Sequence, residues 1–87
     1  MKIKNGFVLR NVCDVYMVIA IGPRAVEFNG MIKLNDTGAF LWQQLQQERT
    51  REELIAAMLE EYEVDEATAA NGVDAFIKTL QSHDLLD

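Results

Sequence analysis

The sequence has little of what most enzymes and secreted proteins depend on. Its 87 residues include one cysteine, one histidine and one proline. The lone Cys13 cannot form an intrachain disulfide, which favours a cytoplasmic location over an oxidising one. The longest run of hydrophobic residues covers 15–21, far short of the ~20 residues that a membrane span requires. No apolar signal core follows the basic start of the chain, so we expect neither secretion nor a membrane partner.

Positive charge is also scarce, and the negative charge is unevenly placed. The net charge is −6, and residues 48–66 alone carry eight acidic residues against two arginines. Residues 1–34 have a local excess of three positive charges. Nucleic-acid binding needs a basic surface that releases counterions, so we expect no nucleic-acid partner. Two interpretations of the acidic stretch stay open: a solvated helix face, or a field that steers a charged partner.

The residues that could support catalysis or hold a cofactor are few. Cys13 and His83 are too few for a Cys/His zinc site, and the glycines lack the spacing of a phosphate-binding loop. One enzymatic hypothesis is a catalytic nucleophile–base pair formed by Cys13 and His83, but no feature of the sequence brings the two residues together. His83 is more typical of a helix end. We therefore predict a protein that is not an enzyme and has no metal or cofactor.

The first third of the chain has strand patterns, and turn residues separate them. Cys13-Asp14 marks one turn, and Asn29-Gly30 is a strong hairpin signal. The second run is rich in β-branched residues on both faces, which predicts a central strand covered on both sides. The predicted antiparallel strands cover residues 7–12, 15–21, 25–28 and 31–34, the last of which we place at a sheet edge.

Three helices are predicted after this sheet, because three residues have the chemistry of helix N-caps. They are Asn35, Thr50 within a Thr-x-x-Glu capping box, and Asp65. Gly72 within the third helix lowers helix stability by ~1 kcal/mol relative to alanine. Two explanations stay open: another backbone approaches this position closely, or the glycine arose by neutral sequence drift. Residues 85–86 are expected to fold back onto the core. Strands followed by helices predict one α+β domain over residues 1–87, similar to a winged helix-turn-helix.

Four segments, in this order and spacing, resemble the PqqD family over residues 5–86. They are LNDTGAFLW at 34–42, ERTREEL at 48–54, EYEVD at 61–65, and FIKTL at 76–80 with Leu85-Leu86. Asp84 departs from the family pattern, in which glycine is common. The resemblance implies a peptide-recognition domain that binds the leader of a ribosomally made precursor peptide. It also implies presentation of that peptide to a modifying enzyme, often a radical SAM enzyme.

The resemblance further implies that the leader adds as a strand to the third strand, in a groove walled by the third helix. An exposed strand edge with pockets for alternate side chains suits such binding. On the third helix, we expect the residues that flank its apolar core stripe to face the peptide. The predicted peptide-binding residues are Met31, Ile32, Lys33, Leu34, Ala70, Val73, Asp74 and Ile77. For Ile32, Leu34, Val73 and Ile77 a place in the core is an open alternative. The free edge also allows either a monomer or an edge-strand dimer.

The competing hypothesis is an acidic winged-helix transcription accessory protein or regulator. Its third helix would then approach DNA. That helix offers only Lys78 as a cation, against Asp65, Glu66 and Asp74. Phosphate would repel this balance of charge, so we place this function second to leader binding.

Overall fold

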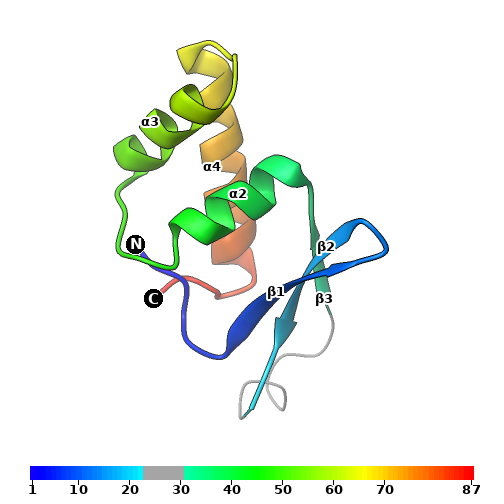
Figure 1. The fold of residues 1–87 in the computed structure, drawn as a ribbon. Coiled ribbons are helices and arrows are strands. Elements are labelled where there is room, and N and C mark those ends of the chain that lie inside the picture. The colour runs from blue at the N-terminus through cyan, green and yellow to red at the C-terminus, as the bar shows by residue number, and fades with distance from the viewer. Residues whose placement is uncertain (23–30) are drawn as a thin grey trace.

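A computed structural model, which describes residues 1–22 and 31–87, shows a three-stranded antiparallel sheet followed by three helices (Figure 1). The predicted α+β class is confirmed. The elements are β1 (Phe7–Val12), β2 (Val15–Ala20), β3 (Met31–Leu34), α2 (Asp36–Gln44), α3 (Arg51–Glu61) and α4 (Glu66–Ser82). Within the described ranges, no helix has both the length and the apolar character required to cross a membrane.

The sheet has the order β1-β2-β3, so the predicted central position of the second strand is confirmed. The turn from β1 to β2 consists of Cys13 and Asp14, with φ angles of 53° and 64°. Positive φ at both central residues is the geometry that closes a tight two-residue hairpin. In β2 only Val18 is buried, and the other five residues are half-buried. Other parts of the chain therefore cover neither face of this strand completely, in contrast to the prediction.

The strand β3 lies at the end of the sheet opposite β1. It pairs antiparallel with β2, in a register that sets Leu34 opposite Tyr16 and Ile32 opposite Val18. No described strand pairs with its outer side, as predicted for this segment. The predicted strand at 25–28 and the Asn29-Gly30 turn lie outside the described residues.

Each helix begins at the N-cap that the sequence predicts. The side chain of Asn35 accepts a hydrogen bond of 2.7 Å from the Gly38 amide, at the start of α2. Thr50 and Glu53 form the complete capping box of α3. These caps satisfy amide groups that have no partner within the helix, and so they fix where each helix starts. The third cap is Asp65, whose side chain accepts a hydrogen bond of 2.7 Å from the Thr68 amide.

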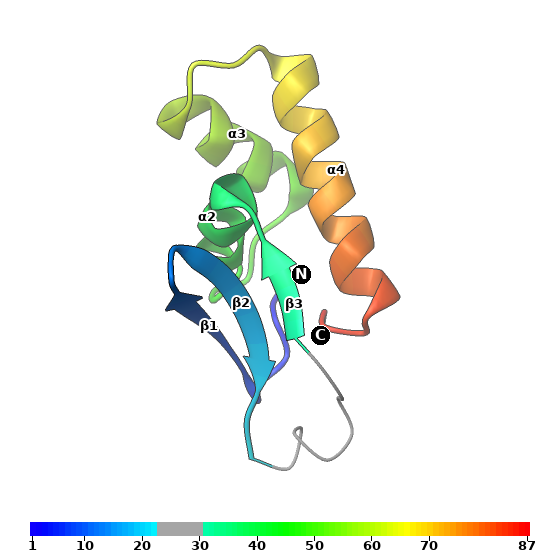
Figure 2. The same cartoon turned by 90° about the vertical axis from the view of Figure 1, so that its right-hand side faces the viewer.

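The core joins the helices to the sheet and includes residues near both ends of the chain. The two termini lie close together (Figures 1 and 2). Leu85 is fully buried, and Ile3 pairs with Leu86 as an isolated β-bridge. The predicted fold-back of residues 85–86 is therefore confirmed. Asp84 makes the reversal possible with a φ of 57°, the left-handed region that glycine favours. Its carboxylate lies 2.9 Å from Lys4 Nζ, so the reversal is also tied to the N-terminal segment.

Candidate functional site

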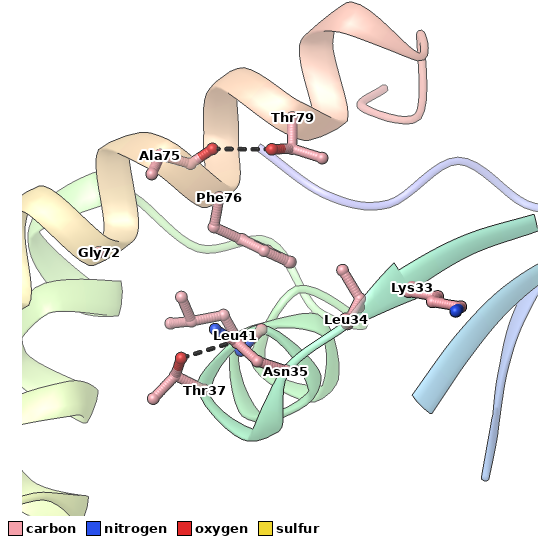
Figure 3. A pocket seen from close by; sticks show the side chains of 10 residues that line it. Lys33, Leu34, Asn35, Thr37, Leu41, Gly72, Ala75, Phe76 and Thr79 are labelled. Atoms are coloured by element: carbon pink, nitrogen blue, oxygen red, sulfur yellow. Dashed lines mark hydrogen bonds between the residues drawn. The ribbon is translucent and has the colours of Figure 1, made fainter. Parts of the chain in front are cut away.

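A pocket of about 290 Å³ lies between the end of β3, the start of α2 and the middle of α4 (Figure 3). We call it the β3–α4 pocket. Three separate parts of the chain supply its walls, and no single sequence motif contains them all. Its lining residues are Lys33, Leu34, Asn35, Thr37, Gly38, Leu41, Gly72, Ala75, Phe76 and Thr79.

The floor of the β3–α4 pocket is apolar. Phe76 extends from α4 toward Leu34 and Leu41 (Figure 3). Phe76 and Leu41 are 6% and 1% exposed, while Leu34 is half-buried, so Leu34 forms the accessible part of this floor. An apolar recess with one partly open side suits an apolar side chain of a ligand.

The two hydroxyl groups beside this floor make hydrogen bonds within the chain. The Thr37 hydroxyl donates to Asn35 Oδ1 at 3.0 Å, and the Thr79 hydroxyl donates to the Ala75 carbonyl at 3.0 Å. Each hydroxyl thus donates to a group of its own helix or of that helix's N-cap, and the fold already satisfies both donors. The pocket therefore offers mainly shape and apolar contact.

The close approach of α2 to β3 depends on Gly38. Only Asn35 separates the strand from the helix, so the first turn of α2 folds directly against the strand end. A Cβ at Gly38 would lie 3.0 Å from Asn35 Oδ1 and 3.3 Å from Leu34 Cβ, which is tighter than ordinary contact. The absence of a side chain thus lets one wall of the pocket meet the next.

The outer edge of β3 supplies a second element of the site. In an antiparallel ladder, alternate residues of an edge strand direct their N–H and C=O groups away from the neighbouring strand. Ile32 is buried at 8% exposure, whereas Lys33 is exposed. Because Lys33 and Leu34 also line the β3–α4 pocket, the main-chain groups of this edge lie directly beside it. Met31 lies in this strand, but the prediction that its side chain lines a pocket falls outside what the structure describes.

The helix α4 meets the pocket on the side opposite to the one chosen from the sequence. At 100° per residue, Ala70, Asp74 and Ile77 project on one side of the core stripe and the lining residues Gly72, Ala75 and Thr79 on the other. The lining residues of the pocket therefore do not include the four predicted helix positions. Sequence periodicity identifies the core stripe, but it does not distinguish the two sides that flank it.

Two of the predicted helix positions have other partners. Val73 is fully buried in the core, the alternative that the sequence left open. The carboxylate of Asp74 accepts hydrogen bonds of 2.6 and 2.9 Å from Arg51 at the start of α3. These bonds lower the pKa of Asp74 and raise that of Arg51. The charge of Asp74 is thus directed toward α3 and away from the pocket.

One part of the acidic stretch, the link between α3 and α4, also lies away from this site. The link between α3 and α4 is at the end of the helices remote from the sheet (Figure 2). Lys33 is the one charged residue among the described lining residues. The pocket is therefore not an acidic surface, although the chain as a whole is negative.

The structure gives no support to the other two hypotheses. The β1–β2 turn, which carries Cys13, and the C-terminal end of α4, which is capped by His83, lie on different sides of the molecule (Figures 1 and 2). A nucleophile–base pair is therefore not formed. In the described ranges, no three Cys, His, Asp or Glu residues gather as metal ligands do. Along α4, Lys78 is the single cation, against Glu66 and Asp74.

A second, more open pocket of about 400 Å³ lies at the other edge of the sheet, between β1 and α2. Its buried base includes Phe7 and Trp42, and the exposed Arg10 lies on its strand side. The molecule thus has a helix beside each edge strand, but only the β3 side places an apolar floor next to α4.

Comparison with known proteins gives one family and two related structures. Residues 18–86 match the family model described as coenzyme PQQ synthesis protein D (PqqD). The structure of TbiB1 in complex with the TbiA(beta) leader peptide aligns with a TM-score of 0.76 and 24% identity, over 100% of this chain and 95% of that chain. Lasso peptide synthetase B1 complexed with the leader peptide aligns with a TM-score of 0.72 and 18% identity, over 97% and 93%. These likenesses establish the shared fold. No curated protein matches the chain.

Proposed function

This chain belongs to the PqqD family, and we propose that it binds the leader segment of a ribosomally synthesised precursor peptide. The observation that carries the proposal is the outer edge of β3, which pairs with no described strand and lies beside the apolar β3–α4 pocket. The two aligned structures, TbiB1 and lasso peptide synthetase B1, were each solved with a leader peptide, and this supports the same class of ligand here.

The proposed binding mode is strand addition. The leader extends the sheet along β3, and main-chain hydrogen bonds to the outer edge of Met31–Leu34 fix its register. Because side chains alternate along a strand, every second leader residue faces the helices. One large apolar side chain then enters the β3–α4 pocket, against Leu34 and Phe76. Gly72, Ala75 and Thr79 form the α4 wall of this groove, in place of the helix side chosen from the sequence.

The biological role that follows is presentation of the precursor to a modifying enzyme. We propose a radical SAM enzyme or a comparable enzyme as that partner, in the cytoplasm, with this chain acting as a binding protein without cofactor. The lone Cys13 fits a reducing compartment. The regulator hypothesis is not favoured, because the two aligned structures are leader complexes and α4 carries little positive charge.

The test is a titration of the fluorescently labelled leader of the precursor peptide encoded nearest this gene, measured by anisotropy. Ala75→Leu fills the pocket from an exposed position without removing a core contact. Ala70→Leu adds the same side chain on the other side of α4. We expect micromolar binding by the wild type, about −8 kcal/mol. We also expect a loss of at least about tenfold with Ala75→Leu, and little change with Ala70→Leu.

The matched pair separates three outcomes. If only Ala70→Leu lost binding, the peptide would lie on the side of α4 that was predicted from the sequence. Equal binding by all three proteins would place the leader away from α4. No binding by a folded wild type would contradict leader capture. Light scattering during the titration tells whether the free edge of β3 pairs with a second copy or leaves a monomer.

A further inference from the structure

Gly72 lies at a helix position where glycine is unfavourable. It is the seventh residue of α4, which runs from Glu66 to Ser82, so it lies well inside the helix. An interior glycine destabilises a helix relative to alanine, because the unfolded chain has more conformational freedom to lose. Its φ is not among the positive values, so the backbone conformation does not require glycine either. A requirement for glycine here would have to come from outside the helix itself.

Packing within the chain does not supply that requirement. A Cβ at Gly72 would have only Met58 Cε within 4 Å outside its own helix, at 3.9 Å, which is ordinary van der Waals contact. No backbone approaches it, so the close approach considered from the sequence is absent in the described residues. Gly38 differs, because a Cβ there would lie 3.0 Å from Asn35 Oδ1. The chain needs glycine at position 38 and would accept alanine at 72.

The position of Gly72 in the groove suggests what does require it. Gly72 is exposed, it lines the β3–α4 pocket, and it precedes Ala75 by one helical turn on the same side. We propose that Gly72 is a specificity-determining residue, which leaves the α4 wall open so that a large apolar side chain of the bound leader can lie against the helix backbone. This inference rests on the proposed leader binding and adds to it the size of the side chain admitted.

The proposal predicts opposite effects of one substitution on stability and on binding. Gly72→Ala should raise the midpoint of thermal unfolding, because alanine is the better helix former. The same variant should bind the labelled leader about tenfold or more weakly, since a single added carbon in a filled apolar pocket has effects of this size. Asn71→Ala is the matched control: it also improves helix propensity at the adjacent exposed residue, which does not line the pocket.

A complementary change in the peptide identifies the contact. Synthetic leaders with each large apolar residue trimmed in turn to alanine are titrated against wild type and Gly72→Ala. At one position, trimming should weaken binding to the wild type and remove most of the difference between the two proteins, as expected for groups in direct contact. A structural effect of the variant would instead lower the affinity for every peptide equally.

The outcomes distinguish this inference from the function on which it rests. If the folded wild type does not bind the leader, the proposed function is wrong and this inference is wrong with it. If the wild type binds and Gly72→Ala binds equally well, only the role of Gly72 is wrong. An equal loss with Asn71→Ala would also overturn it, because helix stiffening would then explain the effect.

Discussion

Arg51 at the first position of α3 donates two hydrogen bonds, of 2.6 and 2.9 Å, to the carboxylate of Asp74 in the middle of α4. This ion pair crosses the two helices on the side of α4 away from the β3–α4 pocket. Both side chains are about half exposed, so the pair contributes little in water with added salt. Its main consequence is to join the two helices and to direct the carboxylate of Asp74 toward α3.

Substitution of Asp74 by asparagine should reduce stability near neutral pH and leave leader binding unchanged. The hydrogen bonds from Arg51 lower the pKa of Asp74 in the folded chain. The pair therefore stabilises the fold above the ordinary aspartate pKa of about 3.9 and loses this effect as the pH falls through the lower folded value. Thermal unfolding of wild type and Asp74→Asn between pH 7 and pH 3 checks this. A difference that stays constant over that range would contradict it.

Removal of the hydroxyl at Thr50 should destabilise the protein through the start of α3. Thr50 Oγ1 accepts from the Glu53 amide at 3.1 Å, and the Thr50 amide donates to the Glu53 carboxylate at 2.9 Å. Thr50→Ala should lower the free energy of unfolding by about 1 kcal/mol, measured in urea. Thr50→Ser keeps the hydroxyl and should stay close to wild type. An equal loss with serine would assign the effect to the methyl group instead.

The two helical glycines near the pocket should respond to alanine with opposite signs. At Gly38 the new Cβ would press on Asn35 Oδ1 and Leu34 Cβ, which disturbs the cap of α2 and the end of β3. We expect Gly38→Ala to cost roughly 1–3 kcal/mol, as overpacking does. Gly72→Ala should stabilise by up to about 1 kcal/mol. The free energy of unfolding of both variants, measured in urea, checks this. A stabilised Gly38→Ala would contradict it and would show that the junction of β3 and α2 can shift to make room for the added Cβ.

Backbone methylation of the leader should reveal strand addition directly. If the leader pairs with the outer edge of β3, the N–H groups of alternate leader residues donate to that edge. Single N-methyl groups at these positions should weaken binding about tenfold or more, and those at intervening positions much less. The series is read by the same anisotropy titration. A loss without alternation would mean that the leader binds without joining the sheet.

Much of the fold follows from local sequence signals. Asn35, Thr50 and Asp65 start the three helices because each side chain bonds a backbone amide three residues ahead, an interaction that needs no distant partner. The Cys13-Asp14 turn was predicted in the same way. Asp84 was noted where the family has glycine, and its positive φ explains that preference. The half-buried faces of β2 were not predicted, because apolar content alone does not tell how completely other elements cover a strand.

The sequence by itself determined the order of the elements, the edge position of 31–34 and the family of the chain. Only the tertiary structure decided which side of α4 faces that edge. Leu34 and Phe76 meet in the pocket although 41 intervening residues separate them, so no local pattern encodes their contact. Both flanks of a core stripe are equivalent in a helical repeat. The packing of α3 through Arg51 and Asp74 distinguishes them, and it leaves Gly72 and Ala75 for the groove.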